Sequence, residues 1–345
     1  MTSSSPFANA VEAAAENPAP GILAELRSRG RRSFSALGLP DRRQEKWRFT
    51  RLKDLSQTIF EAPAAVAPRI DLDRVNLPGA HVLVFVDGVF DDTLSDVSNL
   101  PDGVIVSNLV LAAAAGSEVV DRHLGTLAPL EEQPFAALNS AVFSDGAVIH
   151  LPASTRLERP VHVINATGTD GRPTLSAPRL LLVAEEGARA TVIETNLGAR
   201  GQALSCPVAE IVIGENASIE HVVVSEGGSE NSLIGVRQVQ IAAAGRYDAQ
   251  TVSLDGQLIR TDIEVALEGV HRLVERLRIL HPQEGVELRG GLSGRAGREH
   301  RQRDRHAGRR RDEVVARIGF DVEGAVEGEA EVGDRRAGGT GVGVG

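Results

Sequence analysis

The sequence predicts a mainly β protein, a parallel β-helix (β-solenoid) that follows a small α-helical N-terminal region. Strand-like segments repeat at a drifting period of roughly 24 to 32 residues, and small residues mark a corner within each repeat. No helical pattern separates the repeats, and the aromatic content of 3% fits a narrow interior filled by stacked aliphatic side chains. An antiparallel sandwich of similar hairpins is the alternative fold.

Three segments precede the predicted solenoid. Residues 1–19 are rich in Ser, Ala and Pro, and we expect a disordered tail there. Residues 20–60 are expected to form the helical region, because apolar residues recur at helical spacing between Ile22 and Leu37. Residues 61–79 begin with the stretch EAPAAVAPR, whose Pro and Ala content indicates a linker.

The predicted β-helix core spans residues 80–270, where β-branched runs are bounded by turn residues. Three copies of the repeat superpose along most of their length, and a fourth copy starts at Thr261, with Val265 before its corner. The first three copies are Arg179–Glu194, Ala209–Val224 and Arg237–Ser253.

This alignment places equivalent residues at the corner of each coil. Small residues suit a corner because they do not crowd the coil stacked above, and glycine can adopt a positive φ. The residues aligned before the corner are Val183, Ile213 and Ile241, and those within it are Gly187, Ala217 and Gly245.

Composition excludes several classes of function. A single cysteine, Cys206, excludes a disulfide framework and a multi-cysteine metal site within the chain. The net charge of −10 and the scarcity of aromatic residues argue against a nucleic-acid partner. No apolar run of about 18 residues predicts a membrane span, and the N-terminal residues do not read as an export signal, so we expect a cytoplasmic protein.

Two motifs resemble the SufB/SufD family of iron–sulfur cluster assembly proteins, and SufD within it. The segment LPDRRQEKWRFTRLKDL (39–55) is similar to the family's N-terminal signature, and the segment 134–164 is similar to its entry into the β-helix. The resemblance covers roughly residues 20–270. The matching positions, which we interpret as structural, are Glu45, Trp47, Arg48, Phe49 and Thr50 in the first motif and Asn139, Asp145 and Gly146 in the second.

The resemblance implies a right-handed parallel β-helix that acts as a non-catalytic scaffold subunit of a SufB–SufC–SufD complex. The implied partners are a SufB-like paralogue and the SufC-like ATPase. No catalytic, cofactor-binding or metal-binding residue is implied for this chain alone. An iron–sulfur cluster or a flavin is expected only at the level of the complex, and the sequence agrees in having no nucleotide-binding G-x-x-x-x-G-K-[ST] loop.

Residues 271–345 do not follow the family pattern. Residues 289–311 contain nine arginines, and neither a strand nor a helix period is visible, so we expect a disordered extension. SufC docking is therefore doubtful, because the family's C-terminal helical domain is not recognisable. The tail is either a native basic extension or the product of a frame change in a GC-rich gene, which we favour; the coding DNA in the other two frames distinguishes them.

Single residues that could carry chemistry have simpler explanations. Cys206 precedes Pro207 at the start of a strand and is expected to be packed in the core. His150, His162 and His221 have no partner at metal-ligand spacing, so we interpret them as solvated or packed histidines. His300 and His306 lie within the arginine run and are not site candidates.

Two other functions stay open on the residues alone. A polysaccharide lyase or hydrolase also uses a β-helix, but it needs paired carboxylates on one face and aromatic sugar platforms, which the sequence does not display. A plain adaptor β-solenoid without a connection to metal is the second alternative.

Overall fold

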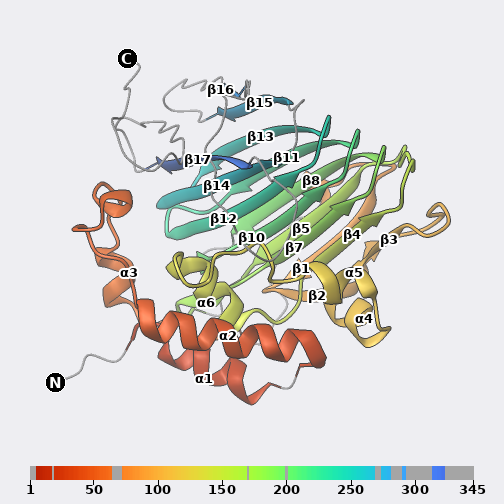
Figure 1. Ribbon diagram of the computed structural model, residues 1–345. Coiled ribbons are helices and arrows are strands. Elements are labelled where there is room, and N and C mark those ends of the chain that lie inside the picture. Colours follow the sequence, from red (N-terminus) through yellow and green to blue (C-terminus); the bar gives the residue numbers. More distant parts are fainter. Residues whose placement is uncertain are drawn as a thin grey trace.

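The computed structural model describes residues 5–17, 19–63, 72–168, 171–198, 201–268, 273–280, 290–292 and 313–322. Within these ranges the chain forms two facing sheets and a layer of helices that lies against one of them (Figure 1). Most neighbouring strands pair in parallel, as expected for stacked coils. The mainly β solenoid with an N-terminal helical region is confirmed.

The first wall of the solenoid is an eight-stranded sheet within the described residues, in the order β16-β15-β13-β11-β8-β5-β1-β2. The outermost strands β2 and β16 pair antiparallel with their neighbours, whereas the inner strands pair in parallel. The bounds are β1 (His81–Val86), β2 (Val89–Asp96), β5 (Val161–Thr167), β8 (Arg189–Gly198), β11 (Ser218–Glu226), β13 (Arg246–Asp255), β15 (Leu273–Leu280) and β16 (Gly290–Leu292).

The second wall has nine strands in the same described ranges, in the order β17-β14-β12-β10-β7-β4-β3; off this path, β9 pairs with β12 and β6 pairs with β9. Here too the outermost strands, β3 and β17, pair antiparallel. The bounds are β3 (Ile105–Asn108), β4 (Ala147–Leu151), β6 (Thr174–Ser176), β7 (Arg179–Ala184), β9 (Ala203–Ser205), β10 (Val208–Ile213), β12 (Asn231–Ile241), β14 (Leu258–Glu268) and β17 (Glu313–Val322).

The space between the two walls is filled by aliphatic side chains stacked from coil to coil. One such row runs across four consecutive strands of the nine-stranded sheet, and each of its members is almost fully buried. Because every coil buries its inward side chains on its neighbours, the stack stabilises itself through the hydrophobic effect. The row consists of Leu182, Ile211, Val239 and Val265.

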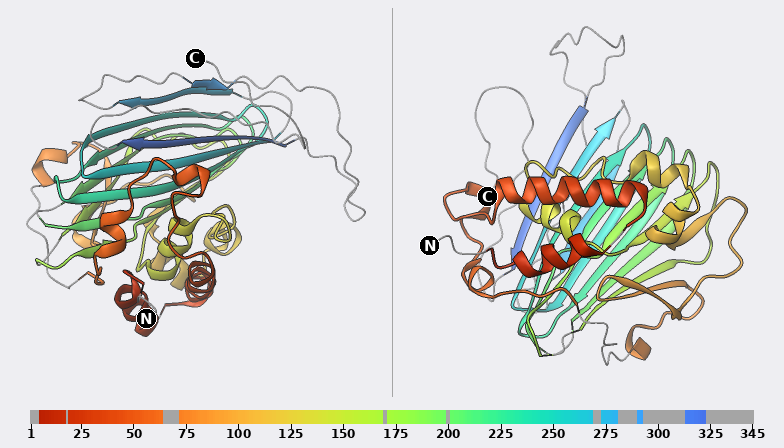
Figure 2. Two further views of the ribbon diagram at one scale, coloured as in Figure 1. Left: turned by 90° about the vertical axis from the view of Figure 1, so that its left-hand side faces the viewer. Right: turned by 90° about the horizontal axis from the view of Figure 1, so that it is seen from below.

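Whereas η2 packs on the outer face of the eight-stranded sheet, most of the helices lie over the outer face of the nine-stranded sheet (Figure 2). Helix α2 buries Leu23 and Leu26 there and lies so close to α6 that a Cβ at Gly30 would overlap the α6 backbone. The bounds are α1 (Ala8–Glu16), α2 (Gly21–Leu37), η1 (Glu45–Trp47), α3 (Lys53–Gln57), η2 (Leu72–Val75), α4 (Leu109–Ala114), α5 (Glu118–His123) and α6 (Pro134–Val142).

The N-terminal segment differs from the expected disordered tail over 1–19. Residues 8–16 form helix α1, and the ring of Phe7, just before it, is fully buried against Phe34 and Phe60. This aromatic cluster gives the segment an apolar anchor, which its Ser, Ala and Pro content did not indicate. In the linker expected over 61–79, the described residues include η2.

The register of the coils corrects the sequence alignment at two of its three steps. Between β7 and β10, Val183 lies opposite Val212 and not opposite Ile213. Between β12 and β14, Ile241 lies opposite Leu267 and not opposite Val265. The expected pairing of Ile213 with Ile241 between β10 and β12 is confirmed. The slip between β7 and β10 matters because a shift by one position moves side chains to the other face of a strand.

The corner of each coil has one residue with a positive φ. Glycine occupies this position only in Gly187, and in the other described coils a non-glycine residue adopts the left-handed conformation. Backbone hydrogen bonds of 2.7–3.1 Å join consecutive corners. The stacked positions, with φ between 55° and 70°, are Ser154, Gly187, Asn216 and Ala244.

The expectation of a patternless extension from residue 271 is wrong for part of that segment. Strand β15 continues the parallel stack on β13, and β17 pairs antiparallel with β14. The arginine run at 289–311 lies outside the described residues except for β16, as do His300 and His306.

Candidate functional site

The N-terminal signature divides into buried and exposed side chains. The ring of Trp47 is buried, with its centroid 5.3 Å from that of Phe135 and 4.1 Å from the guanidinium carbon of Arg260. Arg260 Nη1 also donates a hydrogen bond of 2.9 Å to Oγ1 of the buried Thr50. Through Arg260, Trp47 and Thr50 therefore hold the N-terminal region against strand β14. Glu45, Arg48 and Phe49 are exposed.

The second motif joins α6 to the nine-stranded sheet. Asn139 is fully buried, and its Nδ2 donates to the carbonyl oxygens of Pro178 (2.9 Å) and Cys206 (2.7 Å). Its Oδ1 accepts a hydrogen bond of 3.0 Å from Arg179 Nη1. A Cβ at Gly146 would overlap the carbonyl oxygen of Arg179, so only glycine fits there.

Asp145 connects the start of α4 to the same motif. Its Oδ1 accepts hydrogen bonds from the backbone N–H groups of Val110 (3.0 Å) and Gly146 (2.8 Å), and its Oδ2 accepts one from the side chain of Asn108. Burial raises the pKa of Asp145, although these hydrogen bonds act in the opposite direction. The carboxylate therefore serves as a cap for the short helix.

A buried ion pair lies between the helices and the sheet. Arg179 Nη2 lies 2.7 Å from Glu210 Oε2, and both side chains are fully buried. Glu210 also accepts hydrogen bonds from the backbone N–H groups of Gly125, Leu127 and Ala128. Burial alone would raise the pKa of Glu210, but the charge of Arg179 and these hydrogen bonds leave it below its ordinary value. The pair supports the helical layer.

A second polar cluster lies inside the solenoid, between the two sheets. His221 on β11 is fully buried, with its Nε2 2.8 Å from Oε1 of Glu194 on β8. The other ring nitrogen of His221, Nδ1, lies 2.7 Å from the hydroxyl of Tyr247 on β13. Arg237 on the facing strand β12 is also buried, and its Nη1 lies 3.5 Å from the Thr251 hydroxyl. Three consecutive coils thus place these five polar side chains in the solenoid interior.

Burial and hydrogen bonding determine the protonation of this cluster. Burial lowers the pKa of His221 and raises that of Tyr247 to about 12. Burial would raise the pKa of Glu194, but the hydrogen bond from His221 and the charge of Arg237 hold it below its ordinary value. The neutral Tyr247 hydroxyl therefore donates to His221 Nδ1, and His221 carries its proton on Nε2, facing the Glu194 carboxylate.

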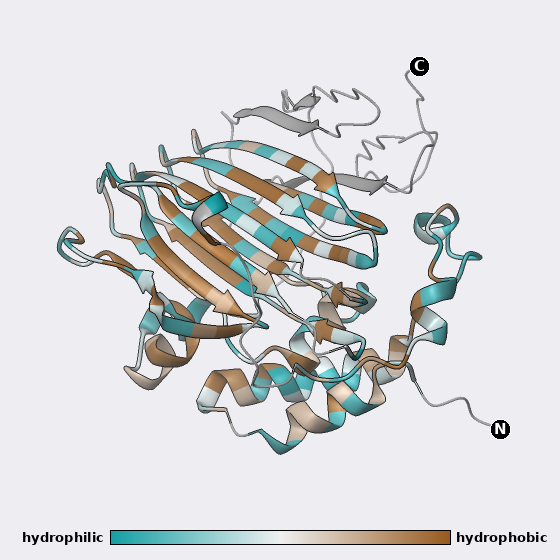
Figure 3. Ribbon diagram, turned by 180° about the vertical axis from the view of Figure 1, so that it is seen from behind, coloured by the Kyte–Doolittle hydropathy of each residue, from teal (hydrophilic) through white to brown (hydrophobic). Residues whose placement is uncertain are grey.

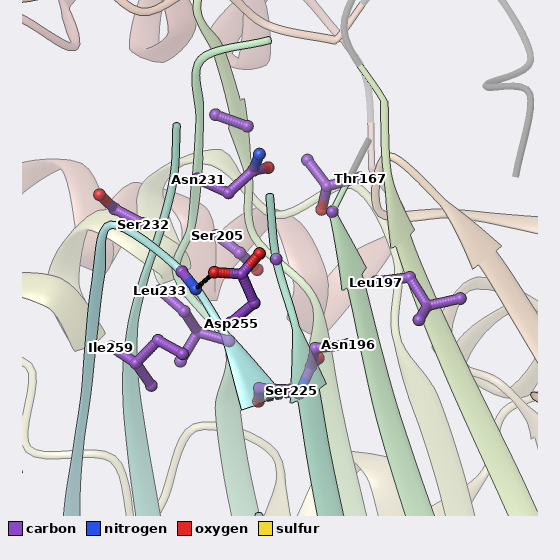
Figure 4. Close-up of a pocket in the computed structure, with 14 residues that line it drawn as sticks. Thr167, Asn196, Leu197, Ser205, Ser225, Asn231, Ser232, Leu233, Asp255 and Ile259 are labelled. Atoms are coloured by element: carbon purple, nitrogen blue, oxygen red, sulfur yellow. Dashed lines mark hydrogen bonds between the residues drawn. The ribbon is translucent and has the colours of Figure 1, made fainter. Parts of the chain in front are cut away.

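Two small cavities lie near this cluster, and only the smaller one is lined by residues of the cluster itself. The larger, about 30 Å³, is lined by Asn196, Ser225 and Asp255 (Figure 4). The smaller, about 20 Å³, shares Asn196 and Ser225 and is lined also by Glu194 and Arg237. Each has room for one or two water molecules. The arrangement can bind water and hold a proton between Tyr247, His221 and Glu194.

The other residues considered in the sequence are packed among protein groups. Cys206 is fully buried, and burial raises the pKa of its thiol. His162 is buried, and its Nε2 lies 2.8 Å from the Thr195 hydroxyl, whereas His150 Nε2 lies 3.0 Å from Glu185 Oε1. Among the described residues, no three His, Cys, Asp or Glu side chains are grouped so that they could hold a metal ion.

Sequence reasoning missed Glu194 as a partner of His221 because the alignment was one residue out of register there. In the register of the sequence alignment, Glu194 lies opposite Val224, on the outer face of the sheet. In the observed register Glu194 lies opposite Val223, and its side chain points into the solenoid together with that of His221. The aligned pairing of Ile219 with Tyr247 is confirmed, so the slip concealed Glu194 and not Tyr247.

Comparison with known proteins identifies the family. A family model described as the SufBD protein N-terminal region matches residues 7–163. A second, described as the SufBD core domain of SUF system FeS cluster assembly, matches residues 162–286. The chain belongs to the SufB/SufD family. The core match ends at residue 286, beyond the boundary at 270 that the sequence pattern indicated.

Individual relatives agree with this membership. An iron–sulfur cluster assembly SufBD family protein of Synechocystis is 31% identical over 71% of this chain and 56% of its own length. A chloroplastic protein of Arabidopsis thaliana is 24% identical over 73% of this chain and 54% of its own length. The chain thus spans slightly more than half the length of these two relatives. Among the described residues, no helix is both long and apolar enough to cross a membrane.

Proposed function

We propose that this chain is a non-catalytic, SufD-like scaffold subunit of a SufB–SufC–SufD complex for iron–sulfur cluster assembly. The observation that carries the proposal is the consecutive match of two SufBD family models over residues 7–286. The structure is consistent with it, because the family-signature residues Trp47, Thr50 and Asn139 join the helical layer to the solenoid. A scaffold works through surfaces that this framework keeps in place.

The partners in this proposal are a SufB-like paralogue and a SufC-like ATPase. The solenoid is the part of the chain that we expect to pair with the SufB-like subunit, since it is the larger body and presents long strands at both ends. SufC docking is expected to be weak for this polypeptide, because its C-terminal residues do not follow the family pattern. A cluster or flavin would bind at the level of the complex.

We prefer this function to a polysaccharide-degrading enzyme or a plain adaptor, because the core family model and the Synechocystis relative are both described by iron–sulfur cluster assembly. Co-expression of the full chain with the SufB-like and SufC-like proteins of the same genome tests the proposal. We expect a binary complex with the SufB-like protein in size-exclusion chromatography. Elution of the folded chain alone, with the SufB-like protein folded and separate, would contradict the proposed pairing.

A further inference from the structure

One part of the N-terminal signature has no packing role in the described fold. Phe49 is 73% exposed, although its neighbours in the signature, Trp47 and Thr50, are buried. A large aromatic ring exposed to this degree leaves apolar surface in water and contributes nothing to the core. Aromatic residues on a rigid support are enriched among the anchors of protein–protein contacts.

The surroundings of Phe49 are basic. Residues 41–54 contain six basic and three acidic side chains, a net charge of +3. Arg42, Arg43, Lys46, Arg48 and Lys53 are all exposed. Residues 72–268, in contrast, contain 11 basic and 26 acidic side chains, a net charge of −15. The segment is thus basic beside an acidic solenoid, a character that it shares with helix α2 and with the arginine run at 289–311.

The segment projects from the helical layer, which makes it accessible. Figure 1 shows α3 on an arm that extends away from α1 and α2, and Figure 3 shows the same arm as a largely hydrophilic projection. The guanidinium carbon of Arg48 lies 5.5 Å from the centroid of the Phe49 ring, and Arg42 Nε donates a hydrogen bond of 3.2 Å to the Arg48 carbonyl oxygen. Arg48 thus lies against the Phe49 ring, and we refer to the exposed basic side chains of this segment as the cationic rim.

We propose that this surface, formed by Phe49 with Arg42, Arg43, Lys46, Arg48 and Lys53, is a docking site for an acidic protein segment that carries a large apolar side chain. The apolar side chain of the partner covers Phe49, and its carboxylates pair with the cationic rim. Because Trp47 and Thr50 fix the turn, little backbone entropy is lost on binding.

Two other polyanionic partners fit less well. A nucleic acid would meet Asp41, Glu45 and Asp54 within the same segment, and a single exposed ring offers no stacking platform for successive bases. An anionic membrane would need a broader apolar face than one exposed phenylalanine provides. A protein segment can match the mixed charges residue by residue.

A peptide selection on the full chain tests the proposal. We expect a library of displayed 15-residue peptides to yield ligands with several Asp or Glu residues and one large apolar residue. Phe49→Ala and Arg48→Glu should each weaken binding of a selected synthetic peptide by about tenfold or more. Leu111→Ala, which truncates an equally large exposed residue on α4 (57% exposed), serves as the control and should leave binding unchanged.

Each contrary outcome is decisive when the variants keep the melting temperature of the parent chain. The proposal is overturned if the selection enriches no peptide that prefers the parent chain to the Phe49→Ala, Arg48→Glu double variant. It is also overturned if the parent chain and all variants bind the selected peptide equally. The same chain is titrated with a 20-nucleotide single strand and with phosphatidylglycerol vesicles. Binding of either that is lost in both variants assigns the surface to that polyanion and also overturns the proposal.

Discussion

His162 illustrates how burial alone determines the charge of a side chain in this fold. The ring is packed on β5 with its Nε2 against the Thr195 hydroxyl, and burial lowers the pKa of His162 to about 4. In the unfolded chain the pKa returns to about 6.5. Between these two values the unfolded state binds the proton and the folded state does not, so stability falls as the pH is lowered through this window.

The pH dependence of stability tests this account of His162. Lowering the pH from 7 to 5 should cost the parent chain about 2 kcal/mol more than it costs the His162→Gln variant, which has no titrating group at that position. Urea unfolding of both proteins at the two pH values measures the difference. Equal losses in the parent and the variant would show that His162 is protonated in the folded state.

The buried Arg179–Glu210 pair should be sensitive to the loss of one partner. Arg179→Met leaves the Glu210 carboxylate buried without its counter-charge, and we expect a loss of about 3–5 kcal/mol. Adding Glu210→Leu to that variant should restore part of the stability, because the unpaired charge is removed. Chemical denaturation measures both changes.

An exposed pair provides the matched control for this substitution. Arg156 and Glu158 form an ion pair of 2.9 Å on the surface, so Arg156→Met should change the stability by less than about 0.5 kcal/mol. A similar loss in Arg156→Met and Arg179→Met would mean that burial does not determine the contribution of the Arg179–Glu210 pair.

At the scale of the elements, two substitutions at the stacked corners should change the stability in opposite directions. Gly187 has a φ of +70° and has only ordinary contacts for an added Cβ, so Gly187→Ala should lower the stability by about 1 kcal/mol through backbone strain. Ala244 has a φ of +55°, and Ala244→Gly should raise the stability by up to about 1 kcal/mol. Thermal unfolding of both variants measures the signs, and a loss in both would contradict the stacking of these corners.

From the sequence it was possible to predict which segments form strands, but not which of their side chains face the interior. Alternation and small-residue corners predicted the parallel coils, because these signals are local. The same one-residue error between β8 and β11 hid the Glu194–His221 contact, because register depends on hydrogen bonding between coils that the local pattern does not contain. Helix α1 was missed for a similar reason, since Phe7 is anchored by distant aromatic rings rather than by its neighbours.

For the whole molecule, the family motifs predicted the fold and the family, and the structure added how the two layers are joined. Trp47 and Thr50 contact Arg260, which lies 210 residues away from Thr50 in sequence, and a contact of that separation cannot be derived from a local motif. The exposure of Phe49 was hidden for the same reason, because the motif does not distinguish its buried residues from its exposed ones. The signature therefore combines an anchor with a surface.

A further prediction for the whole molecule concerns residues 271–345. The family core match extends to residue 286, and β15 continues the parallel stack on β13. We propose that the family reading frame is lost beyond this point rather than at residue 271. Translation of the coding DNA in the other two frames should reveal a continuation of the β-helix pattern, and its absence from both frames would contradict the frame change.

We propose above that this chain supports cluster assembly as a subunit and not by its own chemistry. The most direct test of this proposal is the rate at which an apo-ferredoxin acquires an iron–sulfur cluster from iron, a sulfide source, ATP and the SufB-like and SufC-like proteins, with and without this chain. We predict that the chain raises the rate in the presence of its partners and has no effect when added alone. An unchanged rate with all partners present, or full activity of the chain alone, would contradict the claim.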